Sequence, residues 1–328
     1  MLKLEELKRK CKGVDIVLVS PFKENEEVDY DGFKENIAFL KDKMRGKDVL
    51  ITPTGSCGEF CFLSEEEHKK LIKLAVEEVD GEFPVIAGAG YAGTKKTVDM
   101  CKYAEEVGAD GLQLILPYYF VPTEEGMYEH YKTIAEAVSI GIIPYNNPAF
   151  SKSWIKPALM KKLSEIDNIV GVKENNPHIM LFEGMVRELK STDMAIFCGL
   201  GEGYYAYHCL NDIAGIVSSF SNFGPELTYE MYEAASKKDF AKVLEVKEKM
   251  RPWFAFLGKM AAAHAPDTGA LPKPGGVIYG EGNIRFGIIK EAMNLMGLKG
   301  GKVRLPLTRI TIEEKAELKE ALKKMGLM

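Results

Sequence analysis

The sequence predicts an α/β protein that folds as a (β/α)8, or TIM, barrel with a C-terminal helical extension. Short apolar runs recur along the chain with helical segments between them, which is the pattern of repeated βα units. Several of these runs are apolar at consecutive positions, as expected for parallel strands covered on both faces. The length of 328 residues also suits one barrel with an appendage, because this fold starts near ~250 residues and tolerates extensions.

The apolar runs give eight expected strands, and eight strands with eight crossovers close most economically as a barrel. In chain order, we expect Asp15–Val19, Val49–Thr52, Val85–Gly88, Gly111–Leu116, Ile142–Tyr145, Ile169–Lys173, Ala195–Cys198 and Gly215–Ser218. The clearest helix signal lies between the second and third strands. There Ser64 can cap the helix, Glu67 can reach back to the cap, and Gly81 should end it.

The pattern becomes purely helical after Pro225. We expect helices over roughly residues 227–263, 284–296 and 312–325, with a Pro/Gly-rich loop over 265–282. The predicted domains are therefore a barrel over 1–224 and a helical extension over 225–328 that packs on the barrel.

Charge and composition exclude several classes of protein. A net charge of -5 without a basic block gives no binding surface for nucleic acid or an anionic membrane. The charged N-terminus lacks the apolar stretch of a signal peptide, and no later run approaches the ~18 apolar residues of a membrane span. Six scattered cysteines without a Cys-x-x-Cys pair indicate free thiols. We expect a cytoplasmic protein.

Lys173 and Tyr145 end two consecutive predicted strands. Taken alone, Lys173 could mark only the exit of its strand to solvent, and Tyr145 could be a tyrosine at the rim of the core. In a parallel barrel, however, neighbouring strands deliver both side chains to the same open end, where the chemistry of this fold is found. An amine beside a phenol indicates carbonyl chemistry through a lysine Schiff base, which requires an accessible neutral amine.

The loop after the second strand, Gly55–Phe60, provides a candidate site for a carboxylate. Ser56, Cys57 and Gly58 can expose successive backbone N–H groups just before a helix, although glycines alone would indicate only a turn. A lysine, a tyrosine and a carboxylate cradle suit a 2-oxo acid. Further candidate substrate contacts at strand ends are Asn146, Asn147, Glu174, Asn175 and Ser218, with simple loop capping as the alternative for the loop residues.

Other chemistries receive less support. The five histidines form no ligand pair such as His-Glu-x-x-His, so we expect no metal. The run Gly88–Gly93 fits Gly-x-Gly-x-x-Gly, but the acidic residue that should end the following strand is missing, since Asp110 lies at that strand's start. No Gly-x-Ser-x-Gly elbow is present, and Cys57 has no histidine in its loop. We expect no cofactor.

An ordered set of motifs, from about Ile16 to Leu307, resembles the dihydrodipicolinate synthase / N-acetylneuraminate lyase superfamily of class I, Schiff-base-forming aldolases. Each motif is weak alone, but the order is specific. The motifs are Val19-Ser20-Pro21-Phe22 with Val28-Asp29, Gly55-Ser56-Cys57-Gly58-Glu59, Pro117-Tyr118-Tyr119 with Pro122 and Glu125-Gly126, Tyr145-Asn146-Asn147-Pro148, Gly171-Val172-Lys173, Asn222 with Pro225, and Val303-Arg304-Leu305-Pro306-Leu307.

The resemblance implies roles for these residues. Lys173 would form the imine with pyruvate or another 2-oxo acid, and Tyr145 would shuttle protons. Ser56 matches a hydroxyl-bearing relay position, and its N–H and that of Cys57 would hold the carboxylate. Tyr119 matches a tyrosine that reaches the site of a neighbouring subunit in the synthase branch. Family members are commonly homotetramers built as dimers of dimers, so we expect a homo-oligomer.

Two departures from the family pattern concern the substrate. Cys57 stands where a threonine is usual, which weakens one side-chain hydrogen bond. Phe150 stands where the synthase branch places an arginine for the carboxylate of the second substrate, and this loss argues against a true synthase.

We therefore expect a lyase that acts on pyruvate or on a 2-keto-3-deoxy sugar acid. The alternatives are a keto-deoxy sugar acid dehydratase, a true dihydrodipicolinate synthase (4-hydroxy-tetrahydrodipicolinate synthase), and a silent protein that only binds 2-oxo acids. A nicotinamide oxidoreductase is a more distant alternative.

Overall fold

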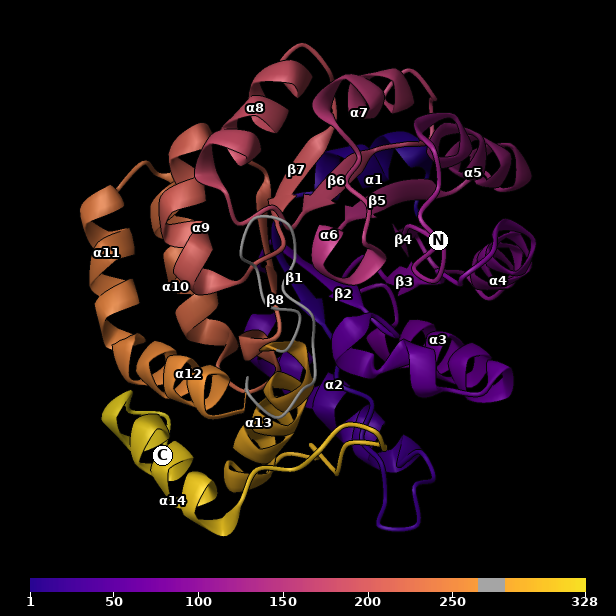
Figure 1. Cartoon of the computed structure of the whole chain (residues 1–328). Helices are drawn as coiled ribbons and strands as arrows, with labels where there is room; N and C mark the ends of the chain where they lie inside the picture. The colour runs from indigo at the N-terminus through magenta and orange to yellow at the C-terminus, as the bar shows by residue number, and fades with distance from the viewer. Residues whose placement is uncertain (265–280) are drawn as a thin grey trace.

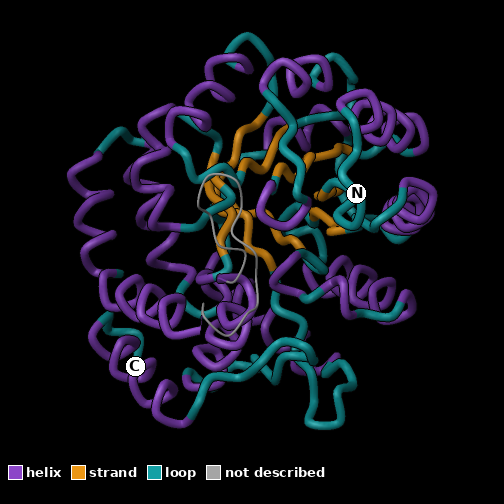
Figure 2. Tube along the Cα trace, viewed as in Figure 1, coloured by secondary structure: helices purple, strands orange, loops and turns teal. Residues whose placement is uncertain are grey.

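Eight parallel strands form the centre of the computed structural model, which describes residues 1–264 and 281–328 (Figures 1 and 2). The hydrogen-bonded order is β2-β1-β8-β7-β6-β5-β4-β3. A parallel bridge between Ile51 and Val85 joins the two outer strands, so the sheet curls into a nearly closed barrel. The strands are β1 (Gly13–Val17), β2 (Val49–Thr52), β3 (Ile86–Gly88), β4 (Gly111–Ile115), β5 (Gly141–Asn146), β6 (Gly171–Glu174), β7 (Ala195–Cys198) and β8 (Gly215–Ser218).

Helices surround this barrel on all sides, as Figure 2 shows in purple around the orange strands. The α-helices up to β8 are α1 (Leu4–Lys10), α2 (Tyr30–Met44), α3 (Glu65–Val79), α4 (Thr94–Glu106), α5 (Glu124–Ala137), α6 (Pro148–Ser151), α7 (Pro157–Leu163), α8 (Ile179–Leu189) and α9 (Glu202–His208). Short 3-10 turns are η1 (Ser56–Gly58), η2 (Phe60–Phe62), η3 (Cys209–Asn211) and η4 (Phe220–Asn222). The predicted (β/α)8 fold is confirmed.

The predicted capping box of α3 is present, since Ser64 Oγ accepts from the N–H of Glu67 and the Glu67 side chain accepts from the N–H of Ser64. Strand boundaries differ from the predicted ones by one or two residues at β1, β3, β4, β5 and β6. The run predicted to end at Val19 leaves the sheet after Val17, because the N–H of Val19 donates to Asn222 Oδ1. The sixth strand begins at Gly171, and Ile169 makes only an isolated bridge to β5.

The C-terminal part is helical, as predicted, with α10 (Pro225–Ser236), α11 (Phe240–Lys249), α12 (Arg251–His264), α13 (Glu281–Leu295) and α14 (Ile312–Lys324). Helix α10 contacts β1, β8, α2 and α9, so it covers the barrel beside the last strand. Helices α12, α13 and α14 contact one another, and Figure 1 shows them together at the lower left. The division at residue 224 stays a prediction. The predicted 265–282 loop lies outside the described residues except for its last two, which belong to α13.

One end of the barrel lumen is closed by α1. Leu7 of this helix is 1% exposed and belongs to an apolar cluster with inward residues of several strands. A Cβ on Gly141 would lie 2.6 Å from the Leu7 side chain, so only glycine leaves room for this plug. The cluster consists of Leu7, Cys11, Val17, Leu50, Ile86, Ile143, Val170, Phe197 and Val217.

In the described ranges, no helix combines the length and apolar character needed to cross a membrane. All six cysteines are free thiols.

Candidate active site

Lys173 and Tyr145 lie side by side at the carboxyl end of the barrel. They are direct partners in the register of β5 and β6. Both are buried, with 3% and 7% of their surfaces exposed. The Nζ atom of Lys173 lies 3.8 Å from the centre of the Tyr145 ring. The structure therefore brings together the amine and the phenol that the sequence placed at neighbouring strand ends.

The phenol of Tyr145 is held by the residue that begins the next helix. Asn147 Nδ2 donates to the Tyr145 hydroxyl oxygen at 2.7 Å, while Asn147 Oδ1 accepts from the N–H of Ala149 and caps α6. Asn147 is 1% exposed. In this structure it contacts the catalytic candidate Tyr145, so its amide fixes where the phenol oxygen lies.

The amine of Lys173 has a partner that the sequence analysis did not identify. Its Nζ donates to Gln113 Oε1 at 2.9 Å, and Gln113 Nε2 donates to Asp15 Oδ2 at 2.8 Å. Asp15 Oδ1 also accepts from Thr52 Oγ1 at 2.6 Å. A chain of buried polar groups thus runs from Lys173 into the barrel.

The loop after β2 reaches the site through a tight turn. Thr54 has a positive φ of 56°, and its hydroxyl donates to the carbonyl of Gly88 at 2.8 Å. A Cβ on Gly88 would lie 2.4 Å from the Thr54 carbonyl oxygen, so this close approach requires glycine. Ser56 and Cys57 then begin η1, where the first N–H groups of a helical turn have no partner within the turn. The predicted contribution of Gly58 is wrong, because its N–H donates to the carbonyl of Gly55 at 3.0 Å. Both side chains are half-buried.

The thiol of Cys57 is influenced by two positively charged side chains. Burial raises the pKa of the Cys57 thiol, while the positive charges of Arg285 and Lys173 oppose this rise and Ser219 forms a hydrogen bond. The charges of the candidate Schiff-base lysine and of a second cation therefore both reach Cys57. A neutral thiol there cannot act as an anionic nucleophile.

Arg285 was missed by the sequence analysis because no motif surrounds it. It lies on α13, which reaches the barrel mouth from the C-terminal part of the chain. A Cβ on Gly201 would lie 3.4 Å from Nη2 of Arg285, so the guanidinium also approaches the loop after β7. The side chain is half-buried, and it forms no ion pair within the described ranges.

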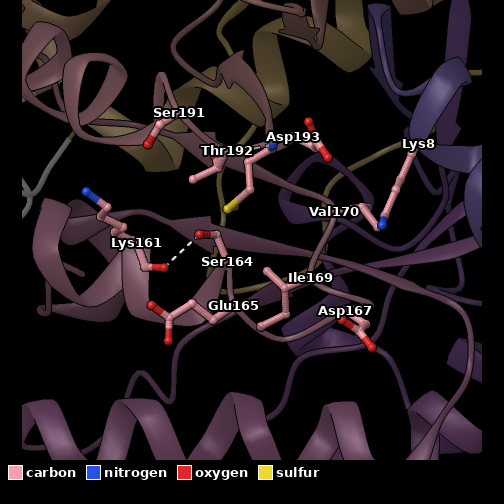
Figure 3. Close-up of a pocket in the computed structure, with 11 residues that line it drawn as sticks. Lys8, Lys161, Ser164, Glu165, Asp167, Ile169, Val170, Ser191, Thr192 and Asp193 are labelled. Atoms are coloured by element: carbon pink, nitrogen blue, oxygen red, sulfur yellow. Dashed lines mark hydrogen bonds between the residues drawn. The ribbon is translucent and has the colours of Figure 1, made fainter.

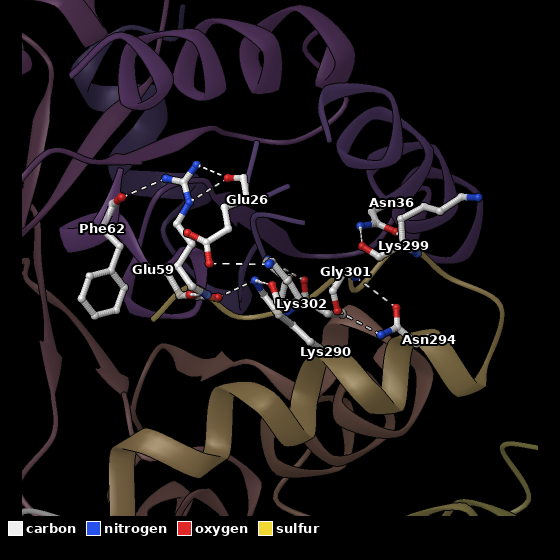
Figure 4. Close-up of polar contacts among 12 residues, drawn as sticks. Glu26, Asn36, Glu59, Phe62, Lys290, Asn294, Lys299, Gly301 and Lys302 are labelled. Carbon is white, nitrogen blue, oxygen red and sulfur yellow. Dashed lines mark hydrogen bonds and ion pairs between the residues drawn. The ribbon is translucent and has the colours of Figure 1, made fainter. Parts of the chain in front are cut away.

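A polar clamp fixes the β2 loop against the C-terminal segment (Figure 4). Glu59 follows η1 with a positive φ of 53° and is 1% exposed. It forms a buried ion pair with Lys290 of α13, whose Nζ also donates to the carbonyl of Lys302 at 2.6 Å. The N–H of Arg304 donates to Glu59 Oε2 at 3.0 Å. The motif around Arg304 therefore supports the loop that carries Ser56 and Cys57.

The two residues after Lys173 differ in role, since Glu174 caps the loop and Asn175 lies at the site. Glu174 Oε2 accepts from Asn146 Nδ2 at 2.7 Å and its Oε1 accepts from the N–H of Asn176 at 2.9 Å, which is the loop-capping arrangement. Burial raises the pKa of Glu174 to about 8. Asn175 Oδ1 is buried without a hydrogen-bond partner in the described chain. A Cβ on Gly199 would lie 1.7 Å from that oxygen and 2.9 Å from Lys173 Cγ.

Three other residues of interest lie away from Lys173 or are engaged elsewhere. The Ser218 hydroxyl donates to Glu202 Oε1 and accepts from the N–H of Ser221 at 2.9 Å. Tyr119 is 70% exposed, and its ring packs edge-on against Phe120. Phe150, at the position of the missing arginine, is 43% exposed on α6. In a single chain, Tyr119 therefore does not join the buried site.

A separate pocket of about 430 Å³ opens at the opposite end of β6 and β7 (Figure 3). It lies among the segments that precede these strands, together with Lys8 of α1. Because the chemistry of this fold sits at the carboxyl ends of the strands, this pocket is not the candidate active site. Within the described residues, no group of three or more His, Cys, Asp or Glu side chains is arranged to hold a metal ion.

The chain is similar to known proteins over nearly its full length. Residues 10–265 match the model of the dihydrodipicolinate synthetase family. A protein of Archaeoglobus fulgidus named 4-hydroxy-tetrahydrodipicolinate synthase is 33% identical over 316 residues, covering 96% of this chain and 99% of that protein. A protein of the same name from Methanocaldococcus jannaschii is 34% identical, covering 97% of this chain and 99% of its own length.

Solved structures give the same result. A dihydrodipicolinate synthase from Aquifex aeolicus matches with a TM-score of 0.82 and 33% identity, covering 96% of this chain and 98% of that one. The dihydrodipicolinate synthase of Thermotoga maritima matches with a TM-score of 0.83 and 30% identity, covering 97% and 99%.

Proposed function

Because the chain belongs to the dihydrodipicolinate synthetase family, we propose that Lys173 and Tyr145 are the residues that carry out its reaction. The protein is a class I lyase of the dihydrodipicolinate synthase type, which works through a Schiff base on pyruvate. The observation that carries the assignment of residues is the buried contact of Lys173 Nζ with the Tyr145 ring at 3.8 Å. The amine becomes the imine nitrogen, and the phenol moves protons.

The chemistry follows from this geometry. The neutral amine of Lys173 attacks the carbonyl carbon of a 2-oxo acid, and loss of water leaves a cationic iminium that accepts electrons from the neighbouring carbon. Tyr145 takes a proton from the reacting hydroxyl when a carbon–carbon bond breaks, and returns one when the bond forms. Asn147 supports this role because its amide holds the phenol oxygen at 2.7 Å.

The carboxylate of the 2-oxo acid is held, in this proposal, by the start of η1. The N–H groups of Ser56 and Cys57 open the turn, and the Ser56 hydroxyl provides a proton relay towards Tyr145. Asn175 is the candidate contact for the rest of the substrate, because its Oδ1 is buried beside Gly199 and has no hydrogen-bond partner among the residues that the structure describes. Glu174 and Ser218 support the site from behind through their own hydrogen bonds.

Two acceptor classes remain for the carbon–carbon step. Phe150 in place of a cation favours an uncharged aldehyde, and hence cleavage of a 2-keto-3-deoxy sugar acid. The relatives named 4-hydroxy-tetrahydrodipicolinate synthase favour condensation of pyruvate with aspartate semialdehyde. Arg285 gives this second candidate a physical basis, because its guanidinium approaches Gly201, its charge reaches Cys57, and a guanidinium can hold a second carboxylate.

The first test is trapping of the imine. We expect borohydride in the presence of pyruvate to add a reduced pyruvyl group to the wild type and not to Lys173→Ala, as measured by intact mass. Separate samples of the wild type, not treated with borohydride, would then be supplied with pyruvate and aspartate semialdehyde or with sugar acids. Release of pyruvate from a sugar acid supports the lyase, an unbroken dehydrated chain supports a dehydratase, and binding without turnover supports a silent homologue.

Arg285→Met separates the two acceptor classes. If Arg285 holds a carboxylate, this variant should raise KM for aspartate semialdehyde by about tenfold or more while pyruvate trapping stays unchanged. An unchanged KM for every acceptor would reject this role of Arg285.

Location and assembly also belong to this proposal. The six free thiols support a cytoplasmic location. The exposure of Tyr119 supports assembly as a homotetramer in which Tyr119 reaches the site of a neighbouring subunit.

A further inference from the structure

A chain of buried polar side chains crosses the barrel lumen beneath the candidate imine nitrogen. It runs from Asp15 on β1 through Gln113 on β4 to Lys173 on β6, and Thr52 on β2 binds its far end. The exposed fractions of Asp15, Gln113 and Lys173 are 2%, 4% and 3%, and that of Thr52 is 0%. Four strands thus contribute to one internal network whose four members are all buried.

The orientation of the Gln113 amide is fixed from both ends. An ammonium group can only donate hydrogen bonds, so the amide must present Oε1 to Lys173. An ionised carboxylate can only accept, so the amide must present its NH2 group to Asp15. The amide dipole therefore lies between a cation and an anion with its carbonyl end towards the cation. Through this oriented dipole, the negative charge of Asp15 favours a positive charge at the lysine nitrogen.

The burial of Asp15 requires such a partner. A carboxylate removed from water is destabilised unless opposite charge and hydrogen bonds compensate. Burial raises the pKa of Asp15, and the charge of Lys173 and the hydrogen bonds from Thr52 and Gln113 oppose that rise. The same three groups are the ones that the geometry identifies, so the charge of Lys173 and the two hydrogen bonds favour the carboxylate form of Asp15 against the effect of its burial.

Other groups near the pair leave this conclusion unchanged. Cys11 lies below Asp15, and burial together with the Asp15 charge raises the pKa of its thiol to about 12, so it stays neutral. On the mouth side, Tyr145 presents its ring to Nζ, and burial raises the pKa of the Cys57 thiol, against which the charges of Arg285 and Lys173 act. Glu174 follows Lys173 on β6 and therefore points to the other face of the strand.

We propose that Asp15, acting through the Gln113 amide, is the internal counter-charge that positions Lys173 Nζ and stabilises the iminium formed on it. This inference rests on the proposed imine chemistry. When neutral Lys173 attacks the carbonyl carbon, a C–N bond forms and the carbonyl oxygen leaves as water with one proton from Nζ and one from solvent. The iminium nitrogen keeps one N–H and a positive charge. That N–H replaces the ammonium as the donor to Gln113 Oε1.

The test compares imine trapping across pH in the wild type, Asp15→Asn, Gln113→Leu and a control. Asp15→Asn removes the negative charge, and Gln113→Leu removes the amide that links this charge to Nζ. In both variants a positive charge on Nζ is less stabilised, so the neutral amine appears at lower pH and the iminium is less stable. We expect the pH of half-maximal trapping to fall by about one unit. At a fixed, subsaturating pyruvate concentration, the trapped fraction should fall about tenfold.

The control is Asn168→Leu, which removes a buried amide that donates to the carbonyls of Ala135 and Val138 near the opposite end of β6. It should lower the melting temperature without moving the pH of half-maximal trapping. A merely structural role of Asp15 and Gln113 would give them the same behaviour as this control, and that result would overturn the inference. Absence of any adduct on the wild type would instead reject the imine function itself.

The wild type offers a second measurement if the network variants do not fold. With the aspartate carboxyl carbons labelled with ¹³C, infrared difference spectra before and after pyruvate addition should show a change in an aspartate carboxyl band. The change should be missing in Lys173→Ala. Difference spectra without an aspartate signal, from a wild type that forms the imine, would overturn the proposal.

Discussion

The two halves of the barrel lumen follow the same geometric rule but carry opposite chemistry. At the end closed by α1, Leu7 packs against glycines and apolar inward residues. Towards the open end, the inward positions of β1, β4 and β6 hold Asp15, Gln113 and Lys173. Every second residue of a strand points inward in both halves. The difference shows that alternation decides which side chains enter the lumen, whereas their polarity decides whether the layer supports the fold or the reaction.

The two halves should therefore respond differently to substitution. In the apolar half, side-chain removal leaves a cavity and lowers the free energy of unfolding. In the polar half, removal of a functional group changes the charge or the proton path at Lys173 and lowers the rate.

The largest expected effect is in the polar half, at Tyr145. Tyr145→Phe keeps the ring against Lys173 but removes the hydroxyl that moves protons. We expect kcat to fall by about 10²- to 10⁴-fold, the range of general acid–base catalysis. The melting temperature should change little, since only the hydrogen bond from Asn147 is lost. Steady-state kinetics with the best acceptor, together with thermal unfolding, measure both quantities.

Asn147→Ala is the matched control for this variant, because it leaves the phenol in place without its amide partner. It should lower kcat less than Tyr145→Phe does. A Tyr145→Phe variant with wild-type kcat would remove the phenol from the mechanism and leave Lys173 as the essential group.

A smaller expected effect, on stability, lies in the apolar half. Leu7→Ala removes a side chain that is 1% exposed and fills the space left by Gly111 and Gly141. Removal of a buried leucine costs about 2–5 kcal/mol. Urea unfolding should show this loss, while the folded variant traps pyruvate at the wild-type rate. Leu4→Ala, at a half-buried position of the same helix, should cost less. A large loss of trapping in folded Leu7→Ala would contradict the separation of the two halves.

The sequence predicted the barrel and the pair at its mouth, because apolar runs and their last residues are local signals. Strands β2, β7 and β8 have the predicted limits, and Tyr145 and Lys173 are register partners. The chain from Asp15 to Lys173 was not predicted. Its signal was a polar residue at the centre of an apolar run, as in Gly111–Ile115. The partners of Gln113 lie 98 and 60 residues away in sequence, on strands that are not its neighbours.

Other parts of the site depend on long-range contacts in the same way. The end of β1 is set by Asn222, which lies 203 residues from Val19. Arg285 reaches the mouth from α13, and nothing in its local sequence indicates that position. Motifs therefore locate side chains on strand ends, whereas contacts between distant strands and helices decide which of them act together.

The last expected effect, on how stability depends on pH, concerns the outer face of β6, where Glu174 follows the inward-pointing Lys173. Burial raises the pKa of Glu174 from 4.5 to about 8. The folded protein therefore keeps this proton at pH values where the unfolded chain has lost it. The stabilisation is complete below about pH 4.5 and is lost as the pH rises towards about 8, by at most ~1.4 kcal/mol per pH unit.

Glu174→Gln removes this titration, so the free energy of unfolding should depend less on pH between about 5 and 8 than in the wild type. Urea unfolding at several pH values measures the slope. Glu188→Gln, on α8 with a side chain 40% exposed, should keep the wild-type slope. If Glu174→Gln also keeps it, then Glu174 is ionised in the folded protein, and a second negative charge lies beside Lys173. Asp15 and Glu174 would then both be carboxylates that could balance the positive charge of the imine.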